Sequence, residues 1–431
     1  MAATEGTNRP LRAALTAACG ALGIAGATAR ATEVQSGAMI YTEPGRVSAF
    51  EAMADGRQEF ADGRTGTFRF VIDALTGSSA NGAVPTAKAQ TFTSPSGSAG
   101  YTTPAGETPL DDTFSDLRFA ASGGLTFPWG RLTSATVGLY ASFERDYTSL
   151  GANAALSRDF NRKNTTLTVH ASRFADSINP MGGVPVGLSQ MPAPTHRPDL
   201  KDDDGGGGNG DNKSVTDLGV GLTQVLTRRT LLSLNYTNSR LSGYQSDPYK
   251  LVSVVDANGD PVPLSATLDE YLYEKRPDRR HKNAAAAELI QNLGRDVLTL
   301  SYRYFDDDWG ITSNTGEVAY RLNFAPDRYL QPNFRQYHQS AADFYRRFLV
   351  QGAAAPEFAS ADYRLGDLSA VSYGLKYGTK LQSGNDLTVR LEYYRQTGEH
   401  HPDTAVGHLR DYDLFPTVDA WIVNVGLSFG N

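Results

Sequence analysis

The stretch Trp421-Ile422-Val423-Asn424-Val425-Gly426-Leu427-Ser428-Phe429-Gly430 alternates between large apolar residues and small or polar ones. Successive side chains of a β-strand point to opposite faces. The apolar residues from Trp421 to Phe429 therefore share one face, and the other face is polar or small apart from Ile422. This alternation predicts a strand with one face suited to lipid and the other suited to water.

The same alternation recurs along most of the chain, in segments of about ten residues, the length that a tilted strand needs to cross a bilayer. The clearest examples are residues 68–73, 137–144, 298–304 and 387–394. A soluble β-sandwich would have shorter strands, of about 5–6 residues, and would hide its apolar face. No run of about 20 apolar residues could cross the bilayer as a helix. The pattern predicts an all-β fold, a transmembrane antiparallel up-and-down β-barrel.

Short and long connections alternate between the segments, which is typical of outer-membrane barrels with tight periplasmic turns and long extracellular loops. Periplasmic turns are expected at residues 161–162, 227–228, 292–294, 325–327 and 383–384. Extracellular loops are expected at residues 74–113, 174–213, 241–283, 339–368 and 396–417. Both ends of the barrel chain then face the periplasm.

The strand count depends on how residues 33–64 are used. Strands from about residue 65 onward give a barrel of about 14, and a further hairpin of residues 33–41 and 46–53 raises the count to about 16. We favour 16 strands, because residues 33–64 otherwise have no obvious place. The alternative is 14 strands preceded by a periplasmic extension.

The N-terminus has the order of a secretory leader. Arg9 and Arg12 precede a small, apolar run at residues 13–25, and Ala27-Thr28-Ala29 forms an A-x-A cleavage site. This order predicts a signal peptide at residues 1–29, a barrel domain at residues 30–431, and export to the outer membrane. The one cysteine, Cys19, falls in the leader, which fits an oxidising periplasm.

Several segments are more specific than barrel patterning requires. They include residues 73–83 (DALTGSSANGA), 143–147 (FERDY), 276–280 (RPDRR), 307–310 (DDWG) and 339–345 (QSAADFY). In this order they resemble the domain-of-unknown-function 3570 family, although Ala80 stands where a proline is expected. The resemblance implies an outer-membrane barrel and no agreed activity. Members of that family occur near genes for periplasmic thioredoxin-like proteins and flavin-attaching enzymes, which implies a periplasmic redox partner.

A set of charged residues is expected at or just beyond the outer ends of the strands. It consists of Asp73, Glu144, Asp146, Asp247, Arg276, Asp278, Arg279, Asp307 and Asp308. If these side chains converge, they form a network with both signs of charge at the mouth or in the lumen. Such a network can select solutes by charge, or it can hold the outer loops against the wall through ion pairs. The sequence leaves both roles open.

Histidines and carboxylates gather in the last long loop, where His400, His401, His408 and Asp403 could ligate a loosely bound divalent metal. Their spacing is not that of an ordered zinc site. The acidic, glycine-rich residues 201–211 have the composition of a solvated loop, with calcium binding as the alternative. No cofactor is required by the sequence, and no catalytic or cofactor-binding residue is predicted.

The formal net charge of −7 provides no basic stripe for nucleic acid. Phosphate-loop and dinucleotide-binding motifs are not found in the sequence. We therefore expect a passive or gated channel for small hydrophilic solutes or ions. The alternatives are a structural or interaction barrel, tied to a periplasmic redox or metal-handling system, and an outer-membrane enzyme. The expected partners are outer-membrane lipid, lipopolysaccharide and the barrel-assembly machinery.

Overall fold

The computed structural model describes residues 32–93, 100–111, 115–180, 182–191, 210–262 and 271–430. The predicted signal peptide and most of the acidic, glycine-rich segment at 201–211 lie outside the described residues. No helix in the described ranges is long and apolar enough to cross a membrane.

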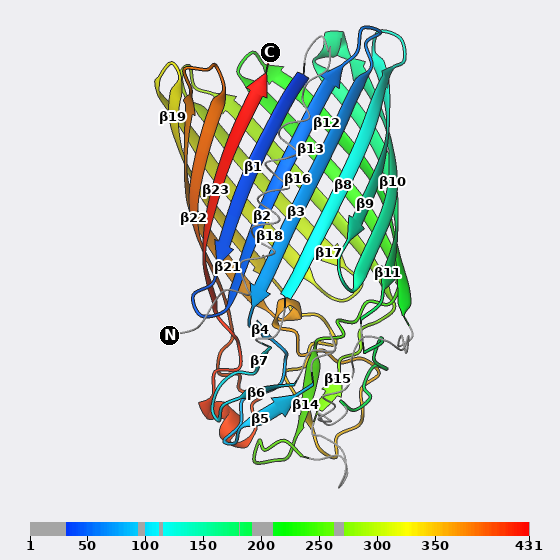
Figure 1. Cartoon of the computed structure of the whole chain (residues 1–431), viewed down its shortest axis with the longest axis vertical. Helices are drawn as coiled ribbons and strands as arrows, with labels where there is room; N and C mark the ends of the chain where they lie inside the picture. The colour runs from blue at the N-terminus through cyan, green and yellow to red at the C-terminus, as the bar shows by residue number, and fades with distance from the viewer. Residues whose placement is uncertain are drawn as a thin grey trace, which may run out of the picture.

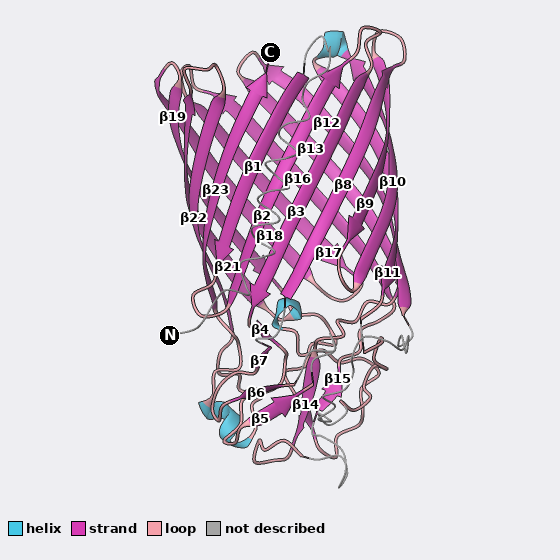
Figure 2. Cartoon of the chain, in the orientation of Figure 1, coloured by secondary structure: helices cyan, strands magenta, loops and turns pink. Residues whose placement is uncertain are grey.

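Sixteen antiparallel strands close into one barrel (Figures 1 and 2). Each strand pairs with the barrel strand before it and the barrel strand after it in the sequence, and the last pairs with the first. The barrel strands are β1 (Thr32–Thr42), β2 (Val47–Glu59), β3 (Thr65–Gly77), β8 (Ser115–Pro128), β9 (Thr133–Phe143), β10 (Tyr147–Phe160), β11 (Thr165–Ile178), β12 (Asp211–Thr227), β13 (Thr230–Gly243), β16 (Arg279–Asn292), β17 (Val297–Asp307), β18 (Thr312–Ala325), β19 (Arg328–Gln339), β21 (Leu368–Lys380), β22 (Asp386–Gly398) and β23 (Val418–Gly430).

The first and last strands close the barrel. β1 pairs with β23 from Glu33 opposite Gly430 to Thr42 opposite Trp421, and it pairs with β2 on its other side. The predicted N-terminal hairpin is therefore part of the wall, which confirms 16 strands and excludes the alternative of 14.

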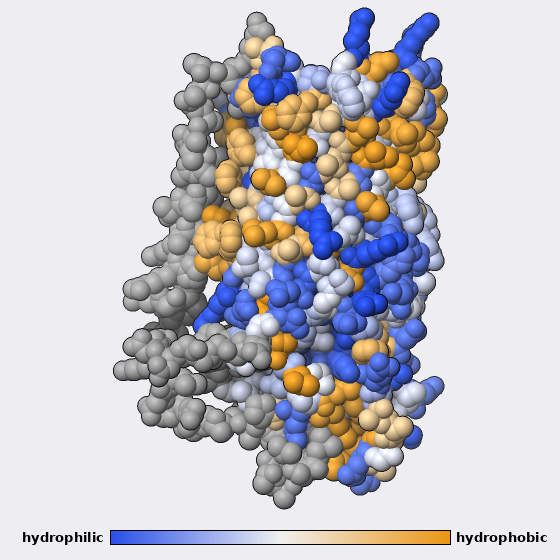
Figure 3. All heavy atoms as spheres, turned by 90° about the vertical axis from the view of Figure 1, so that its right-hand side faces the viewer, coloured by the Kyte–Doolittle hydropathy of each residue, from blue (hydrophilic) through white to orange (hydrophobic). Residues whose placement is uncertain are grey.

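The alternation predicted for the last strand also holds in the structure. Trp421 and Val425 point outward and are 46% and 43% exposed, whereas Asn424 lies in register with Arg390 on the lumen side. Figure 3 shows apolar side chains gathered on the wall near the short turns and a more polar wall toward the opposite end. A closed barrel leaves no unpaired strand edge in the lipid.

The connections follow the predicted asymmetry. Short turns join β10 to β11, β12 to β13, β16 to β17, β18 to β19 and β21 to β22, all at one end of the barrel (Figure 1). The turn at η1 (Asn161–Lys163) has three consecutive residues with positive φ. The five long connections, residues 78–114, 179–210, 244–278, 340–367 and 399–417, leave from the other end.

The described parts of the long connections build a folded cap beyond the barrel end, rather than separate loops (Figures 1 and 2). It contains the short strands β4 (Ser79–Ala80), β5 (Gln90–Phe92), β6 (Tyr101–Thr103), β7 (Leu110–Asp111), β14 (Leu251–Val255), β15 (Tyr271–Tyr273) and β20 (Leu349–Val350). It also contains two 3-10 helices, η2 (Tyr363–Leu365) and η3 (Gly407–Asp411).

The cap has apolar cores of its own. One cluster brings Phe92, Met191 and Leu251 together from three different long connections. A second packs Val255 against Leu409 of the last connection. Burial of this apolar surface stabilises the cap at about 25 cal/mol per Å², so the described parts of the long connections are fixed to one another.

At Gly77, where β3 leaves the wall, the backbone conformation and the close approach of another strand require a glycine. Its φ is +125°, and an added Cβ would lie 2.1 Å from the carbonyl oxygen of Arg46. We expect Gly77→Ala to destabilise the barrel by about 1–3 kcal/mol, measured as a lower midpoint of urea unfolding in detergent. The matched control is Gly45→Ala, because Gly45 also has a positive φ, +73°, but its added Cβ meets nothing within 4 Å. Equal midpoints for the two variants would contradict the argument.

Candidate functional site

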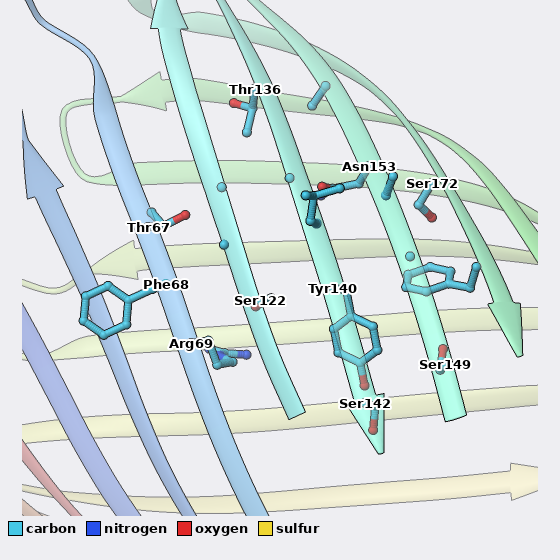
Figure 4. A pocket seen from close by; sticks show the side chains of 18 of the residues that line it. Thr67, Phe68, Arg69, Ser122, Thr136, Tyr140, Ser142, Ser149, Asn153 and Ser172 are labelled. Carbon is cyan, nitrogen blue, oxygen red and sulfur yellow. The ribbon is translucent and has the colours of Figure 1, made fainter. Parts of the chain in front are cut away.

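The barrel lumen contains a cavity of about 1120 Å³ along the wall from β1 to β12. Its lining is rich in small and hydroxyl side chains, and Figure 4 shows Thr136, Tyr140 and Asn153 among the residues that line it. Gly138, Gly151 and Gly124 leave room between these side chains. The lumen wall on this side is therefore polar and hollow instead of being filled by large residues.

Ion pairs lie along the same wall. The guanidinium of Arg118 donates to Asp73 at 2.5 Å, and that of Arg69 donates to Asp55. The register of β2, β3 and β8 places these four side chains on the lumen face. The predicted lumen residue Asp73 thus lies in a wall with charges of both signs.

A second pocket of about 410 Å³ lies between the barrel rim and the cap. It shares Glu144 and Tyr147 with the lumen cavity, so these two residues stand at the junction of the two spaces. Tyr249 of the cap donates its hydroxyl proton to Asp146 of the rim. Burial raises the pKa of Glu144 to about 7, and the nearby carboxylate of Asp116 adds to the shift.

Near this rim, a cluster of charges joins separate connections of the cap, and we call it the cap network. Most of its side chains are buried, whereas that of Arg364 is 55% exposed. The network consists of three acidic and three basic side chains, Asp247, Lys250, Glu274, Arg276, Asp362 and Arg364. They come from the connections at residues 244–278 and 340–367.

Asp362 is the centre of the cap network. Its side chain is 1% exposed, and its Oδ2 accepts from Arg276 at 2.8 Å and from Arg364 at 2.6 Å. Arg276 also pairs with Glu274 at 2.6 Å, and Arg364 reaches Asp247 at 2.9 Å. Burial alone would raise the pKa of Asp362, but Arg364, Lys250 and Arg276 hold it well below its ordinary value.

Lys250 and Glu274 extend the network into the interior of the cap. The ammonium of Lys250 donates to the carbonyl oxygen of Ala80 in another connection, and burial lowers the pKa of this lysine. Glu274 accepts from the hydroxyl of Ser360, and burial raises its pKa despite the neighbouring Arg276. The network therefore binds three of the five long connections together.

The residues predicted to form one mouth network are divided among several places. Asp73 lies in the lumen, Glu144 and Asp146 line the rim pocket, and Asp247 and Arg276 belong to the cap network.

Of the remaining predicted residues, Asp307, Asp308 and Arg279 hold the turn between β17 and β18, whereas Asp278 bonds the end of β13. Asp307 accepts from Arg280 Nε at 2.7 Å, and Asp308 accepts from the backbone N–H of His281 at 2.9 Å. Asp278 and Arg279 contribute backbone carbonyls, to Gly243 N–H and to the indole N–H of Trp309, each at 2.9 Å.

Sequence reasoning missed Glu274, Asp362 and Arg364 as members of a site. The available signal was weak. Glu274 stands two residues before the recognised Arg276, and Asp362 lies in a connection far along the chain. Lys250, three residues after the predicted Asp247, was missed as well.

The structure does not assemble the predicted metal site. His400 Nδ1 lies 2.8 Å from Asp413 Oδ1, His401 Nδ1 lies 3.2 Å from the carbonyl oxygen of Arg410, and His408 lies 3.9 Å from Asp260, while Asp403 is exposed. Within the described ranges no group of three or more His, Cys, Asp or Glu side chains is arranged to hold a metal ion.

The sequence profile of the family described as "Protein of unknown function (DUF3570)" matches residues 11–429. The chain belongs to this family. Among curated proteins, none matches the sequence.

Several solved structures are similar to this chain at low sequence identity. A bacterial polysaccharide outer membrane secretin has a TM-score of 0.44 at 9% identity, covering 92% of this chain and 97% of its own. OccK3 from Pseudomonas aeruginosa has a TM-score of 0.40 at 8% identity, covering 93% and 95%. The siderophore receptor PirA from Acinetobacter baumannii has a TM-score of 0.42 at 8% identity, covering 87% of this chain and 54% of its own. The chain thus spans about half the length of that receptor.

Proposed function

We propose that this family member is a passive or gated channel of the outer membrane for small hydrophilic solutes or ions. The observation that carries the proposal is the lumen cavity of about 1120 Å³, which adjoins the rim pocket at Glu144 and Tyr147. A barrel of 16 strands is wide enough to leave an aqueous passage unless its interior is filled. The apolar outer wall would contact outer-membrane lipid and lipopolysaccharide.

The polarity of the lining supports hydrophilic solutes. Hydroxyl and amide side chains such as those of Ser122, Thr136 and Asn153 face the cavity, and they can replace part of the hydration shell of a solute. Charges of both signs on the same wall reduce the electrostatic cost of passage for either sign.

The folded cap supports gating. It lies beyond the long-loop end of the barrel (Figure 1), and the rim pocket runs between the cap residues Tyr244 and Tyr249 and the wall at Asp116. Solutes would pass between cap and rim at this side. A movement of the cap would widen or narrow this route without any change in the barrel wall.

Purified protein in planar lipid bilayers is expected to give a steady current that is carried by small ions. We expect Ser122→Trp, which places an indole in the cavity, to reduce the single-channel conductance roughly by half. Ala121→Trp is the matched control, because the adjacent residue on β8 faces the lipid beside Phe70 and its indole would leave the lumen unchanged.

A folded barrel that gives no steady current would overturn the channel proposal. That result would favour the structural or interaction barrel, whose function is to present the cap at one membrane face and to hold a periplasmic partner at the other. Equal loss of conductance in the two tryptophan variants would indicate damage to the wall instead of a block of the passage.

A further inference from the structure

The lumen has a second hollow on the wall next to the large cavity, because its first strand, β13, pairs with β12, the last strand that lines the large cavity. It measures about 240 Å³ and is lined by residues of β13, β16 and β17, none of which line the large cavity. This volume is many times the 10–15 Å³, roughly, that one water molecule requires. The hollow can therefore hold a small solute group.

The strand register explains why the wall is hollow here. Three neighbouring rows on the lumen face are Asn235–Ala286–Arg303, Thr237–Ala284–Phe305 and Ser239–Lys282–Asp307. Ala284 lies in the row between those that carry Lys282 and Arg303, and Ala286 lies beside Arg303, so the floor here is made of small side chains. Small side chains between two long cationic ones leave space that both cations border.

Lys282 lacks a carboxylate partner at salt-bridge distance in the described ranges, although two carboxylates are close in the register. Asp307 is already occupied, because its Oδ2 accepts from Arg280 and its Oδ1 accepts the backbone N–H groups of Trp309 and Ile311 at 3.1 and 2.9 Å. Asp217 accepts from Ser172 at 3.0 Å and from Ser239 at 2.5 Å. The ammonium group is therefore left for another ligand.

The guanidinium of Arg303 contacts an aromatic ring and has no carboxylate partner in a salt bridge among the described residues. The guanidinium lies 5.9 Å from the ring centroid of Phe305. All nine residues that line the hollow are basic, neutral or aromatic. Two cations next to an open space, with no acid among its lining residues, attract an anion.

We propose that this hollow is a binding subsite for an oxyanion group, a carboxylate or a phosphate, of a small solute in the lumen. Lys282 and Arg303 would supply charge-assisted hydrogen bonds, and Thr237 and Asn235 would add neutral ones from the β13 side. The proposal deepens the channel function and rests on it for its role in transport, since it names an anionic group of the solute that the channel takes.

The test is calorimetric titration of the detergent-solubilised full chain with inorganic phosphate and, separately, with acetate. We expect saturable binding of at least one anion. Lys282→Met and Arg303→Met are each expected to weaken this binding about 10- to 100-fold, the loss expected for one charge-assisted hydrogen bond. Lys376→Met is the matched control and should bind as the parent protein does, because Lys376 faces the lumen from β21 in register with Arg390, outside the hollow.

Each outcome decides the proposal. Binding of phosphate alone assigns a tetrahedral oxyanion, binding of acetate alone assigns a carboxylate, and either supports the subsite. Binding of neither anion, or equal binding in parent, Lys282→Met and Arg303→Met, overturns it. Lys282→Gln, a smaller change, serves in case the methionine variant does not fold.

The subsite and the channel can fail separately. Conductance without anion binding would keep the channel and remove the subsite. Anion binding without conductance would keep the subsite and remove the channel. If both hold, phosphate or acetate should reduce the chloride current of the parent protein at concentrations near those that saturate the calorimetric binding. The chloride current of Lys282→Met should not change when the same anion is added over the same concentration range.

Discussion

Replacement of Asp362 by alanine is expected to loosen the cap and to increase conductance. The variant removes the central carboxylate from the buried Arg276 and Lys250 and from the partly exposed Arg364. Removal of one partner from a buried ion pair typically costs about 3–5 kcal/mol. We expect this loss in the free energy of unfolding of the cap, because the barrel wall does not depend on the network.

Hydrogen–deuterium exchange can measure the effect in each region. Exchange should become faster in residues 244–262 and 340–367 of Asp362→Ala, while β8 to β10 keep their protection. Single-channel conductance should rise in the same variant, since a loosened cap obstructs the rim pocket less. Asp362→Asn, which keeps the shape of the side chain, should show the same direction with a smaller change.

Glu399→Ala provides the matched control for this experiment. Glu399 pairs with Arg347 at 3.1 Å in the same part of the molecule, but its side chain is 58% exposed. A solvent-exposed pair contributes about 0–1 kcal/mol, so exchange and conductance should stay close to those of the parent. If Asp362→Ala behaves like Glu399→Ala, the network does not hold the cap.

The barrel could be predicted because its signal is local. Each wall strand contacts lipid on one face and the lumen on the other, so the division appears in the sequence of every strand, as in the alternation of β23. The closing hairpin of β1 and β2 could be predicted because residues 33–64 have no other obvious place, whereas parity alone does not separate 14 strands from 16.

The cap could not be predicted because its signal is not periodic. β14 (Leu251–Val255) is buried at all five positions, and a short continuous apolar run does not distinguish a strand from other buried structure. Its partners, β15 and β20, lie in parts of the chain that sequence reasoning treated as loop. The apolar residues Val252 and Val255 were available as a sign that this connection is folded.

The candidate site was found only in part for a similar reason. Arg276 and Asp362 are 86 residues apart, and Arg364 and Asp247 are 117 apart, so their pairing depends on how two connections pack. The histidines show the opposite, because residues that are close in sequence are placed apart by the fold. His400 and His408 are close in sequence, but η3 (Gly407–Asp411) carries His408 toward Asp260 while His400 pairs with Asp413.

Glu144 is expected to give the proposed channel a pH dependence near neutrality. Its folded-state pKa, about 7, is above its ordinary value because burial and Asp116 both oppose the charged form. The folded protein therefore binds a proton at this site more tightly than the unfolded chain does. The contribution of protonated Glu144 to stability is fully present below the ordinary pKa of a glutamate and is lost as the pH rises toward about 7.

The preference for cations over anions is accordingly expected to increase between pH 6 and 8, roughly the range in which Glu144 at the junction of lumen and rim pocket becomes charged. One added charge about 7 Å from a passing ion in water changes its energy by about 0.6 kcal/mol, or about threefold in local cation concentration. Reversal potentials in a potassium chloride gradient measure this change.

Glu144→Gln should remove the change in cation preference near pH 7. Glu288→Gln, which neutralises a lumen carboxylate of β16 in register with Ser301, should keep it. A change that survives in Glu144→Gln would assign the titration to another group.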